Sequence, residues 1–264
     1  PPYSYEVDGQ PRGIDVELGK LIAQEMGVEF RVHWIIPDEE LGDDLRNNVW
    51  KGHYLDKQRL ADVMMRVPYD KQYAYMQDST GEYINEQVVL FGPYQQETWQ
   101  IAYNPEKLDT VDTVAVFQYH PIGVEIDTLP DFYLSSALQG RMRNQVRHYP
   151  NVRAAFEAMR NGEVSAVMGM RAEIHHELAK PENEAFMQAQ NGFPGLMKQV
   201  WDVGMAVKHT HRQLGYAIEG IVNRLVTEGT LSEVFTGMEL AYSVPGYYRD
   251  FLSEEAIAQA EGQK

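Results

Sequence analysis

The chain has 264 residues, 44% of them hydrophobic, which allows a sizeable core in one large domain or two small ones. Its formal net charge of −16 argues against binding to nucleic acids or anionic membranes, and suits either simple solubility or a basic protein partner. The lack of cysteine excludes disulfides and cysteine-ligated metals, and no apolar run reaches the roughly 18 residues of a membrane-spanning helix.

The first elements are predicted from hydrophobic spacing. Apolar residues recur at helical intervals over 15–26, and Gly27 follows where a helix would end. Residues 28–34 alternate in the manner of a strand, a helix is expected over 41–50, and a strand over 61–67.

The alternation of helix and strand continues to the end of the chain, which indicates an α/β fold. A short helix is predicted over 69–77 and a strand over 86–91, followed by a crossing over 94–103. The next part should contain strands at 113–117, 122–126, 146–149 and 164–169 and helices over 130–139, 151–160 and 171–179. A return segment over 199–204 and helices over 211–228 and 231–236 complete the predictions. The tail beyond Ser253 is expected to be a helix or a frayed end.

Several short motifs occur in a fixed order. The chain opens with Pro1-Pro2-Tyr3-Ser4-Tyr5 and Gly13-Ile14-Asp15-Val16-Glu17-Leu18, and later carries Ala61-Asp62-Val63-Met64-Met65, Glu163-Val164-Ser165-Ala166-Val167-Met168, Gly204-Met205-Ala206-Val207 and Glu228-Gly229-Thr230-Leu231-Ser232-Glu233-Val234-Phe235. In this order and spacing they resemble the type II periplasmic solute-binding proteins of family 3.

The resemblance implies a two-lobed α/β fold with two crossover strands that form a hinge. Lobe one would comprise residues 1–95 plus 200–264, lobe two residues 101–198, and the tail 253–264 would fray. The hinge would involve Tyr94, Tyr103 and Val203. The family also has a strand before the position of Pro1, which we expect to be missing from this sequence, as is the signal peptide.

The function implied by the resemblance is non-catalytic binding of a small molecule in an interlobe cleft, in the periplasm, by a monomer that delivers it to an ABC permease without a cofactor or metal. The predicted cleft residues are Tyr3, Tyr5, Arg66, Tyr69, Lys71, Asp127, Thr128, Met170, Arg171 and Trp201. Tyrosine and tryptophan rings would supply contact area, although such residues also pack at lobe edges.

The ligand-contact positions depart from those of amino-acid binders in the family. Lys71 lies near the position of the arginine that binds the ligand carboxylate, and lysine lacks the planar guanidinium; Arg66 would replace it or lie on the surface. Met170 and Arg171 stand where an aspartate binds the ligand ammonium. Asp127 precedes the helix whose backbone N–H groups hold the carboxylate, with Thr128 beside it. We therefore expect a ligand other than a standard α-amino acid.

An alternative function rests on the segment Asp62-Val63-Met64-Met65-Arg66-Val67-Pro68-Tyr69-Asp70. It resembles a segment of the J-type branch of the family, which is associated with periplasmic PQQ-dependent methanol dehydrogenases. That resemblance implies an accessory protein of a quinoprotein alcohol dehydrogenase, with a weak or vestigial ligand cleft.

An enzyme is the third hypothesis, and the motifs disfavour it. The sequence has no G-x-S-x-G, P-loop or H-E-x-x-H motif. His175 and His176 are adjacent, so on a helix they would point about 100° apart and a solvated helix face explains them better than a metal site. The carboxylates of Asp38-Glu39-Glu40 and Asp43-Asp44 could attract a hard cation, but they lack EF-hand spacing, and acidic loop and helix-start residues are the favoured explanation.

Overall fold

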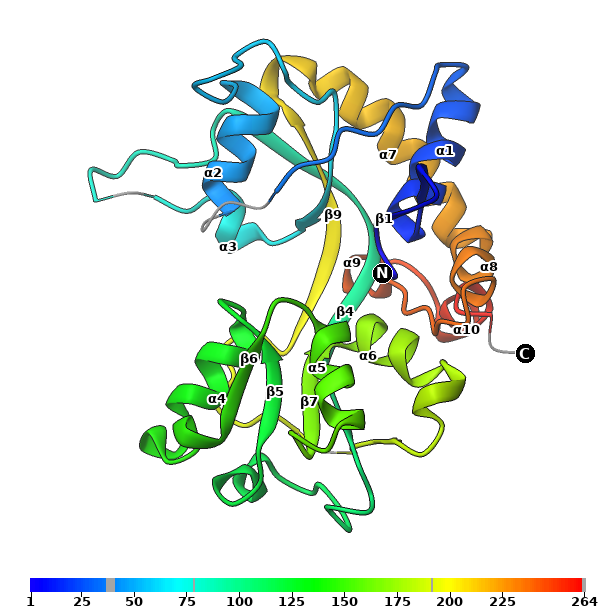
Figure 1. Ribbon diagram of the computed structural model, residues 1–264. Coiled ribbons are helices and arrows are strands. Elements are labelled where there is room, and N and C mark those ends of the chain that lie inside the picture. Colours follow the sequence, from blue (N-terminus) through cyan, green and yellow to red (C-terminus); the bar gives the residue numbers. More distant parts are fainter. Residues whose placement is uncertain (37–40, 78, 191, 263–264) are drawn as a thin grey trace. The chain divides into compact units, whose positions relative to one another are not determined.

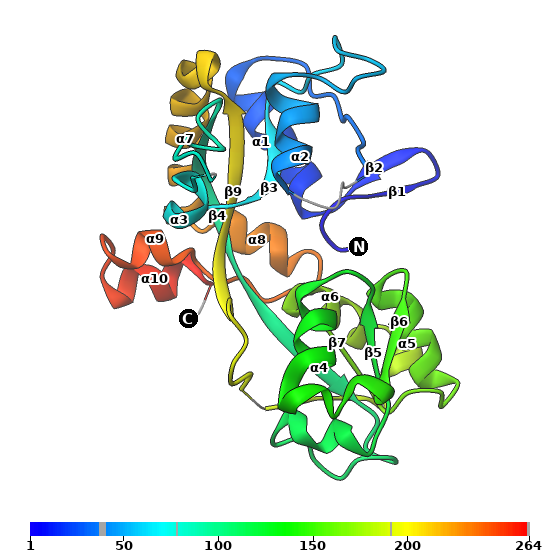
Figure 2. The same cartoon turned by 90° about the vertical axis from the view of Figure 1, so that its left-hand side faces the viewer.

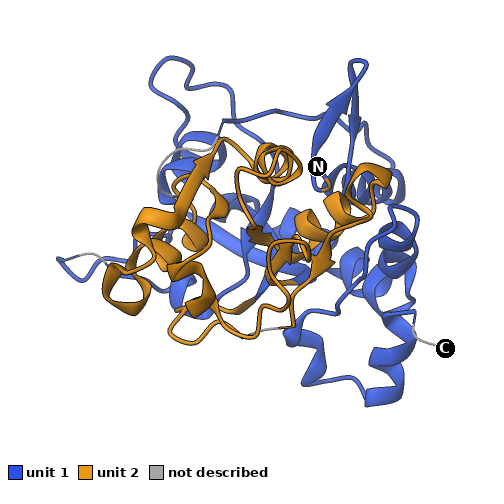
Figure 3. Cartoon of the chain, turned by 60° about the horizontal axis from the view of Figure 1, so that its bottom comes forward, with its two compact units in different colours: residues 1, 3–96, 201–264 blue, residues 2, 97–200 orange. Residues whose placement is uncertain are grey.

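The computed structural model describes residues 1–36, 41–77, 79–190 and 192–262. The chain divides into two compact units (Figure 3): unit 1 comprises residues 1, 3–96 and 201–264, and unit 2 comprises residues 2 and 97–200. The chain passes between them within strand β4 (Val88–Tyr103) and at the start of strand β9 (Val200–Lys208).

Unit 1 combines strands and helices from both ends of the chain (Figure 1). Its strands are β1 (Tyr5–Val7), β2 (Gln10–Arg12), β3 (Met64–Pro68), β9 and the first part of β4. Its helices are α1 (Ile14–Met26), α2 (Leu41–Leu45), the π-helical turn η1 (Arg46–Trp50), α3 (Lys71–Ala74), η5 (His209–His211), α7 (Arg212–Thr227), α8 (Thr230–Thr236), α9 (Gly246–Arg249) and α10 (Glu254–Ala260).

Helix α1 confirms the prediction from hydrophobic spacing. It buries Ile14, Leu18 and Ile22. The helix contacts α7 and α8 (Figures 1 and 2). Gly27 ends the helix in the left-handed conformation, with φ of 66°, which glycine adopts without a steric penalty. The first turn of α1 carries Asp15, so a carboxylate lies at the positive end of the helix.

The sheet of unit 1 pairs β3 with β9 in antiparallel register, with Met64 opposite Ala206 and Pro68 opposite Val203. The register shifts between Met65 and Val67, which leaves Arg66 as an extra residue. One face of this pair packs against α2 and η1 through a buried cluster of Leu45, Val49, Val67 and Ala206. This packing fixes the position of β3 and therefore of Arg66.

Unit 2 is a smaller α/β unit with a mixed sheet. Its strands are the second part of β4, β5 (Ile122–Glu125), β6 (Val146–Tyr149), β7 (Ala166–Met170) and β8 (Met187–Gln188). Its helices are η2 (Val114–Gln118), α4 (Leu129–Gly140), η3 (Arg143–Gln145), α5 (Val152–Arg160), α6 (Arg171–Leu178) and η4 (Pro181–Asn183). Strand β5 runs parallel to β6 and β7, while β4 pairs antiparallel with β7 and β8.

The core of unit 2 lies between its sheet and α5. Phe156, Met159, Val167 and Ile174 are fully buried in one cluster. A Cβ atom at Gly169 would lie only 2.7 Å from Cγ2 of Val152, so the glycine permits the close approach of α5 to β7.

Two predicted strands are wrong. Residues 28–34 form no strand, because no strand of the described part of the chain pairs with their backbone, although the ring of Phe30 packs against Gly19. Residues 114–118 form the short helix η2 in place of a strand, beginning where the hydroxyl of Thr113 accepts a hydrogen bond from the backbone N–H of Ala115 at 3.4 Å.

The tail beyond Ser253, expected to be a helix or a frayed end, is helical over part of its length. Residues Glu254–Ala260 form α10, which contacts α7 and α8 and buries Ile257 and Ala260. The hydroxyl of Ser253 begins this helix by accepting a hydrogen bond from the N–H of Ala256 at 3.2 Å. Among the described residues, no helix combines the length and apolar character needed to cross a membrane.

Candidate functional site

Arg66 adopts a backbone conformation that is rare for its residue type. Its φ is 61°, in the left-handed region, and it lies at the register shift between β3 and β9. Such conformations cost of the order of 1 kcal/mol and persist where the surroundings enforce them. The bulge takes Arg66 out of the alternation of β3 and directs its side chain toward the start of α1.

Arg66 forms a two-point ion pair with Asp15. Nε of Arg66 donates to Oδ2 of Asp15 at 2.8 Å, and Nη2 donates to Oδ1 at 3.3 Å. The hydroxyl of Tyr94, on β4, donates to the same Oδ1 atom at 2.7 Å. The side chain of Asp15 is 7% exposed and that of Arg66 is 24% exposed, so water competes little for these bonds.

Two further contacts hold the guanidinium in place. Nη2 of Arg66 donates to Oε1 of Gln95 at 3.1 Å, and Cζ lies 3.3 Å from the centroid of the Tyr3 ring, a cation–π contact. Burial alone would lower the pKa of Arg66, but the charge of Asp15 and the neighbouring Tyr94 and Tyr3 raise it above its ordinary value. Arg66 is therefore a permanent cation whose charge Asp15 balances.

Tyr94 remains a neutral donor in this cluster. Burial raises the pKa of its hydroxyl well above the ordinary value, and the nearby charge of Asp15 raises it further. The ring is fully buried, and the backbone carbonyl of Tyr94 accepts a hydrogen bond from the hydroxyl of Tyr242 at 2.8 Å. We call Tyr3, Asp15, Arg66, Tyr94 and Gln95 the Arg66 cluster.

The other predicted site residues of unit 1 lie outside this cluster. Lys71 is exposed at the first position of α3. Tyr69 packs edge-on against Tyr247, with ring centroids 5.6 Å apart. Tyr5 lies in β1 and Trp201 in β9, both half-buried. The structure thus brings Tyr3 and Arg66 together.

In unit 2, the start of α4 is occupied by another carboxylate of the chain. Asp127 has φ of 60°, and its N–H donates to Oδ2 of Asp131 at 3.1 Å. Oδ1 of Asp131 accepts the hydroxyl of Ser135 at 3.1 Å and lies 2.9 Å from Nε2 of His148. Thr128 donates its hydroxyl to the carbonyl of Glu125 at 2.7 Å. Asp131, with 7% exposure, is thus a buried internal acceptor at this helix start.

Met170 and Arg171 lie where β7 joins α6. The N–H of Met170 donates to Oε2 of Glu173 at 3.2 Å. Nε of Arg171 lies 3.9 Å from Oε1 of Glu97, and their side chains are 18% and 0% exposed. The charge of Arg171 is therefore balanced within unit 2 by a buried glutamate on β4.

The three predicted hinge residues are sheet residues in the structure. Tyr94 and Tyr103 lie in β4, and Val203 lies in β9 opposite Pro68 of β3. A hinge role for them stays a prediction.

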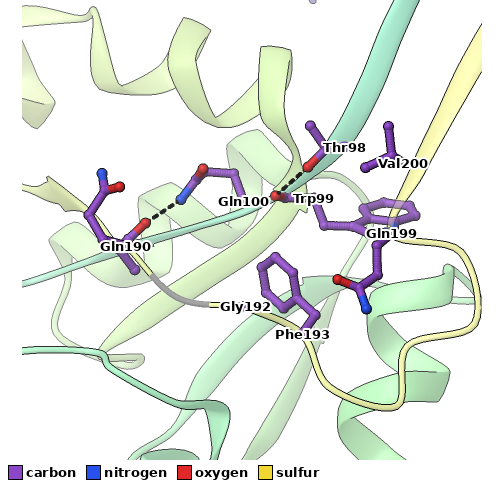
Figure 4. Close-up of a pocket in the computed structure, with 9 residues that line it drawn as sticks. Thr98, Trp99, Gln100, Gln190, Gly192, Phe193, Gln199 and Val200 are labelled. Atoms are coloured by element: carbon purple, nitrogen blue, oxygen red, sulfur yellow. Dashed lines mark hydrogen bonds between the residues drawn. The ribbon is translucent and has the colours of Figure 1, made fainter. Parts of the chain in front are cut away.

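Unit 2 also contains a cavity of about 290 Å³ without a charged side chain in its lining (Figure 4). Trp99 and Phe193 supply aromatic faces, and Gln190 and Gln199 supply amides. Nε2 of Gln100 donates to the carbonyl of Ala189 at 2.7 Å and so braces the wall. This cavity can hydrogen-bond a polar molecule, but it offers no ion pair.

The candidate cation sites gain no support from the described residues. Asp43 forms an ion pair with Arg46 at 2.5 Å, and Asp44 is buried. Asp38, Glu39 and Glu40 lie outside the described residues. Within the described ranges, no three His, Asp or Glu side chains are grouped so as to hold a metal ion.

Sequence reasoning identified Arg66 and Tyr3 but missed their partners. In the sequence, Asp15 stands out only as part of the opening motif, and nothing marks Gln95, Glu97 or Asp131. The one available signal was an aspartate at a position of α1 that is buried among Ile14, Val16 and Leu18. A buried carboxylate requires a partner, but its identity depends on the pairing of distant strands.

The fold and these clusters describe an α/β binding protein of the type II periplasmic class, and comparisons with known proteins agree. The model of the bacterial extracellular solute-binding proteins, family 3, matches residues 1–237, so the chain belongs to that family. The predicted family and fold class are therefore confirmed. No curated protein sequence matches the chain.

Solved structures of similar fold come from several bacteria. The substrate-binding protein AbpA of an amino acid ABC transporter from Streptococcus pneumoniae, bound to L-arginine, has a TM-score of 0.64 and 20% identity, covering 90% of this chain and 89% of that one. The P235GK mutant of ArgBP from T. maritima has a TM-score of 0.64 and 19% identity, covering 90% of each chain. A solute receptor for L-cysteine of Neisseria gonorrhoeae has a TM-score of 0.62 and 17% identity, covering 97% and 90%. At these identities the likeness shows the fold alone.

Proposed function

We propose that this family 3 protein binds a small solute in the periplasm, without catalysis, and that the solute is not a standard α-amino acid. The observation that carries the second half of the proposal is the Arg66–Asp15 pair. The Nε–Nη2 edge of this guanidinium already donates to an internal carboxylate, and Nη2 also donates to Gln95, so a ligand carboxylate would have to displace Asp15 from that edge.

The remaining head-group positions support the same conclusion. Lys71, near the position of the family's carboxylate-binding arginine, is exposed and lacks the planar donor pair. At the start of α4, the buried carboxylate of Asp131 already accepts the N–H of Asp127. A ligand carboxylate would therefore have to compete with Asp15 at Arg66 and with Asp131 at the start of α4.

The ammonium-binding position also differs from that of amino-acid binders. Met170 has no carboxylate to pair with an ammonium group, and Arg171 beside it is a cation balanced by Glu97 at 3.9 Å. The ligand we expect is therefore an uncharged or weakly charged solute held by hydrogen bonds and aromatic contacts. Delivery to an ABC permease is the expected role of such a protein.

A binding screen tests this proposal against the ligands of the similar structures. L-arginine and L-cysteine should produce no saturable heat in titration calorimetry, with AbpA and L-arginine as the positive control. A set of neutral sugars, polyols and alcohols without a carboxylate should contain a compound that raises the melting temperature. Saturable binding of any standard α-amino acid would show that the proposed ligand class is wrong.

The alternative role as an accessory of a PQQ-dependent dehydrogenase stays a prediction from the sequence. No contact or surface of the described residues favours it over solute binding. Affinity capture from a detergent-solubilised cell extract separates the two roles, because the alternative requires the quinoprotein and solute delivery requires a permease.

A further inference from the structure

We infer that Asp15 is the specificity-determining residue of the Arg66 cluster: its carboxylate occupies a position that would otherwise accept a small carboxylate ligand. This inference deepens the proposed function and rests on it for its biological meaning. The geometry behind it lies entirely within unit 1 and does not depend on the identity of the natural ligand.

The first part of the argument is the shape of the Asp15 environment. Nε and Nη2 of Arg66 approach its two oxygens at 2.8 and 3.3 Å, and the hydroxyl of Tyr94 approaches Oδ1 at 2.7 Å. This is the arrangement by which a guanidinium binds a free carboxylate, with an added neutral donor. The three donors would recognise any carboxylate that could reach the same position.

The second part is that Arg66 has supports other than Asp15. Tyr3 covers one face of the guanidinium at 3.3 Å, and Gln95 accepts from Nη2 at 3.1 Å. The bulge between β3 and β9 fixes the backbone of Arg66. Removal of the Asp15 carboxylate should therefore leave the donors aimed at a vacancy of carboxylate size.

The third part is the advantage of an internal carboxylate over a free one. Asp15 is fixed in the first turn of α1 and binds Arg66 without loss of translational freedom, whereas a ligand must lose that freedom. The wild-type cluster should therefore exclude carboxylate ligands even at high concentration, and an Asp15 variant should accept them.

Chemical rescue of Asp15→Ala by sodium formate tests this inference. The variant should melt below the wild type, and formate should raise its melting temperature saturably, by about 3–6 °C at a concentration tenfold above the dissociation constant. Sodium chloride at equal ionic strength and formamide, a neutral molecule of similar shape, should have no such effect. The wild type should not respond to formate.

Three further variants separate recognition from general stabilisation. The double variant Asp15→Ala/Arg66→Met should not respond to formate, because it lacks the guanidinium. Asp15→Asn should not respond either, because its amide fills the vacancy. Glu17→Ala removes a carboxylate from the same helix, paired with Lys20 at 2.7 Å on the surface, and serves as the matched control without rescue.

The outcomes are decisive even if Asp15→Ala does not fold in plain buffer. Recovery of its circular dichroism spectrum by formate, and not by chloride or formamide, would support the inference. An equal response of Asp15→Ala and Asp15→Ala/Arg66→Met, or no response of either, would overturn it. Rescue combined with amino-acid binding by the wild type would instead contradict only the proposed function.

Discussion

Oδ1 of Asp202, on β9, accepts a hydrogen bond from the backbone N–H of Gly246 at 2.7 Å, across 44 residues of sequence. Oδ2 accepts the N–H of Tyr247 at 2.9 Å, and Nε2 of Gln96 donates to Oδ1 at 3.2 Å. Asp202 thus supplies acceptors for the first N–H groups of α9 and links the C-terminal segment to the strands of unit 1.

Substitution of Asp202 by alanine should lower the free energy of unfolding by about 2 kcal/mol, because backbone N–H groups lose a charged acceptor. Urea unfolding measures this loss, and limited proteolysis after Arg249 should become faster as α9 loosens. Asp250→Ala, at an exposed position just beyond α9, is the matched control and should change little. Equal stability of the two variants would rule out the capping role.

Gly204 permits a close approach of β9 to its neighbours in unit 1. A Cβ atom there would lie 2.8 Å from the carbonyl oxygen of Phe91 and 3.3 Å from Cβ of Tyr69. Gly204→Ala should therefore destabilise the protein by about 1–3 kcal/mol through strain. Gly42→Ala, where a Cβ meets no atom within 4 Å in α2, should be neutral or stabilising by up to about 1 kcal/mol in the same urea experiment. A neutral Gly204→Ala would show that β9 can shift to make room.

The helices of this fold follow from the sequence more reliably than its strands. Helix α1 is determined by its own apolar spacing and by Gly27, both local features. Residues 28–34 show the alternation of a strand, but a strand also requires a partner, and no local pattern supplies one. At 113–117 the β-branched residues favour a strand, yet the Thr113 cap and the turn of η2 prevail.

The candidate site was only partly predictable for a related reason. Arg66 could be singled out from its position after a family motif, but its direction depends on the bulge opposite β9. The partner Asp15 lies 51 residues away along the chain, and the donor Tyr94 lies 79 residues from Asp15. These contacts arise from the packing of β3, β4 and α1, which a single sequence does not encode in any local pattern.

Tyr73 should make the stability of the protein sensitive to alkaline pH. Burial raises the pKa of its hydroxyl to about 12, and its ring packs against the cluster of Leu45, Val49, Val67 and Ala206. An unfolded tyrosine has a pKa of about 10, so between about pH 10 and 12 the unfolded chain loses a proton that the folded chain keeps. This contribution is complete below pH 10 and falls as the pH rises toward 12.

Tyr73→Phe should therefore lose less stability than the wild type between pH 9 and pH 11.5, as measured by urea unfolding at each pH. Tyr54→Phe, at a residue that is 77% exposed, is the control and should follow the wild-type curve. Parallel curves for Tyr73→Phe and the wild type would contradict the assignment of the alkaline loss to Tyr73.

The Arg66–Asp15 pair should show strong coupling in a double-mutant cycle. Arg66→Gln leaves a carboxylate with 7% exposure without its cation, so the free energy of unfolding should fall by about 3–5 kcal/mol. Asp15→Asn should also destabilise, because it leaves the guanidinium uncompensated. The double variant should lose less than the sum of the two, by about 1.5–3 kcal/mol, since each single change already breaks the pair.

Arg66→Gln also removes the cation over the Tyr3 ring. A second double-mutant cycle, of Arg66→Gln with Tyr3→Leu, isolates this cation–π contact, for which a coupling energy of about 1 kcal/mol is expected. Strict additivity of the unfolding free-energy changes of Arg66→Gln and Asp15→Asn would mean that the two side chains act independently. The proposal that Asp15 excludes carboxylate ligands from Arg66 would then lose its physical basis.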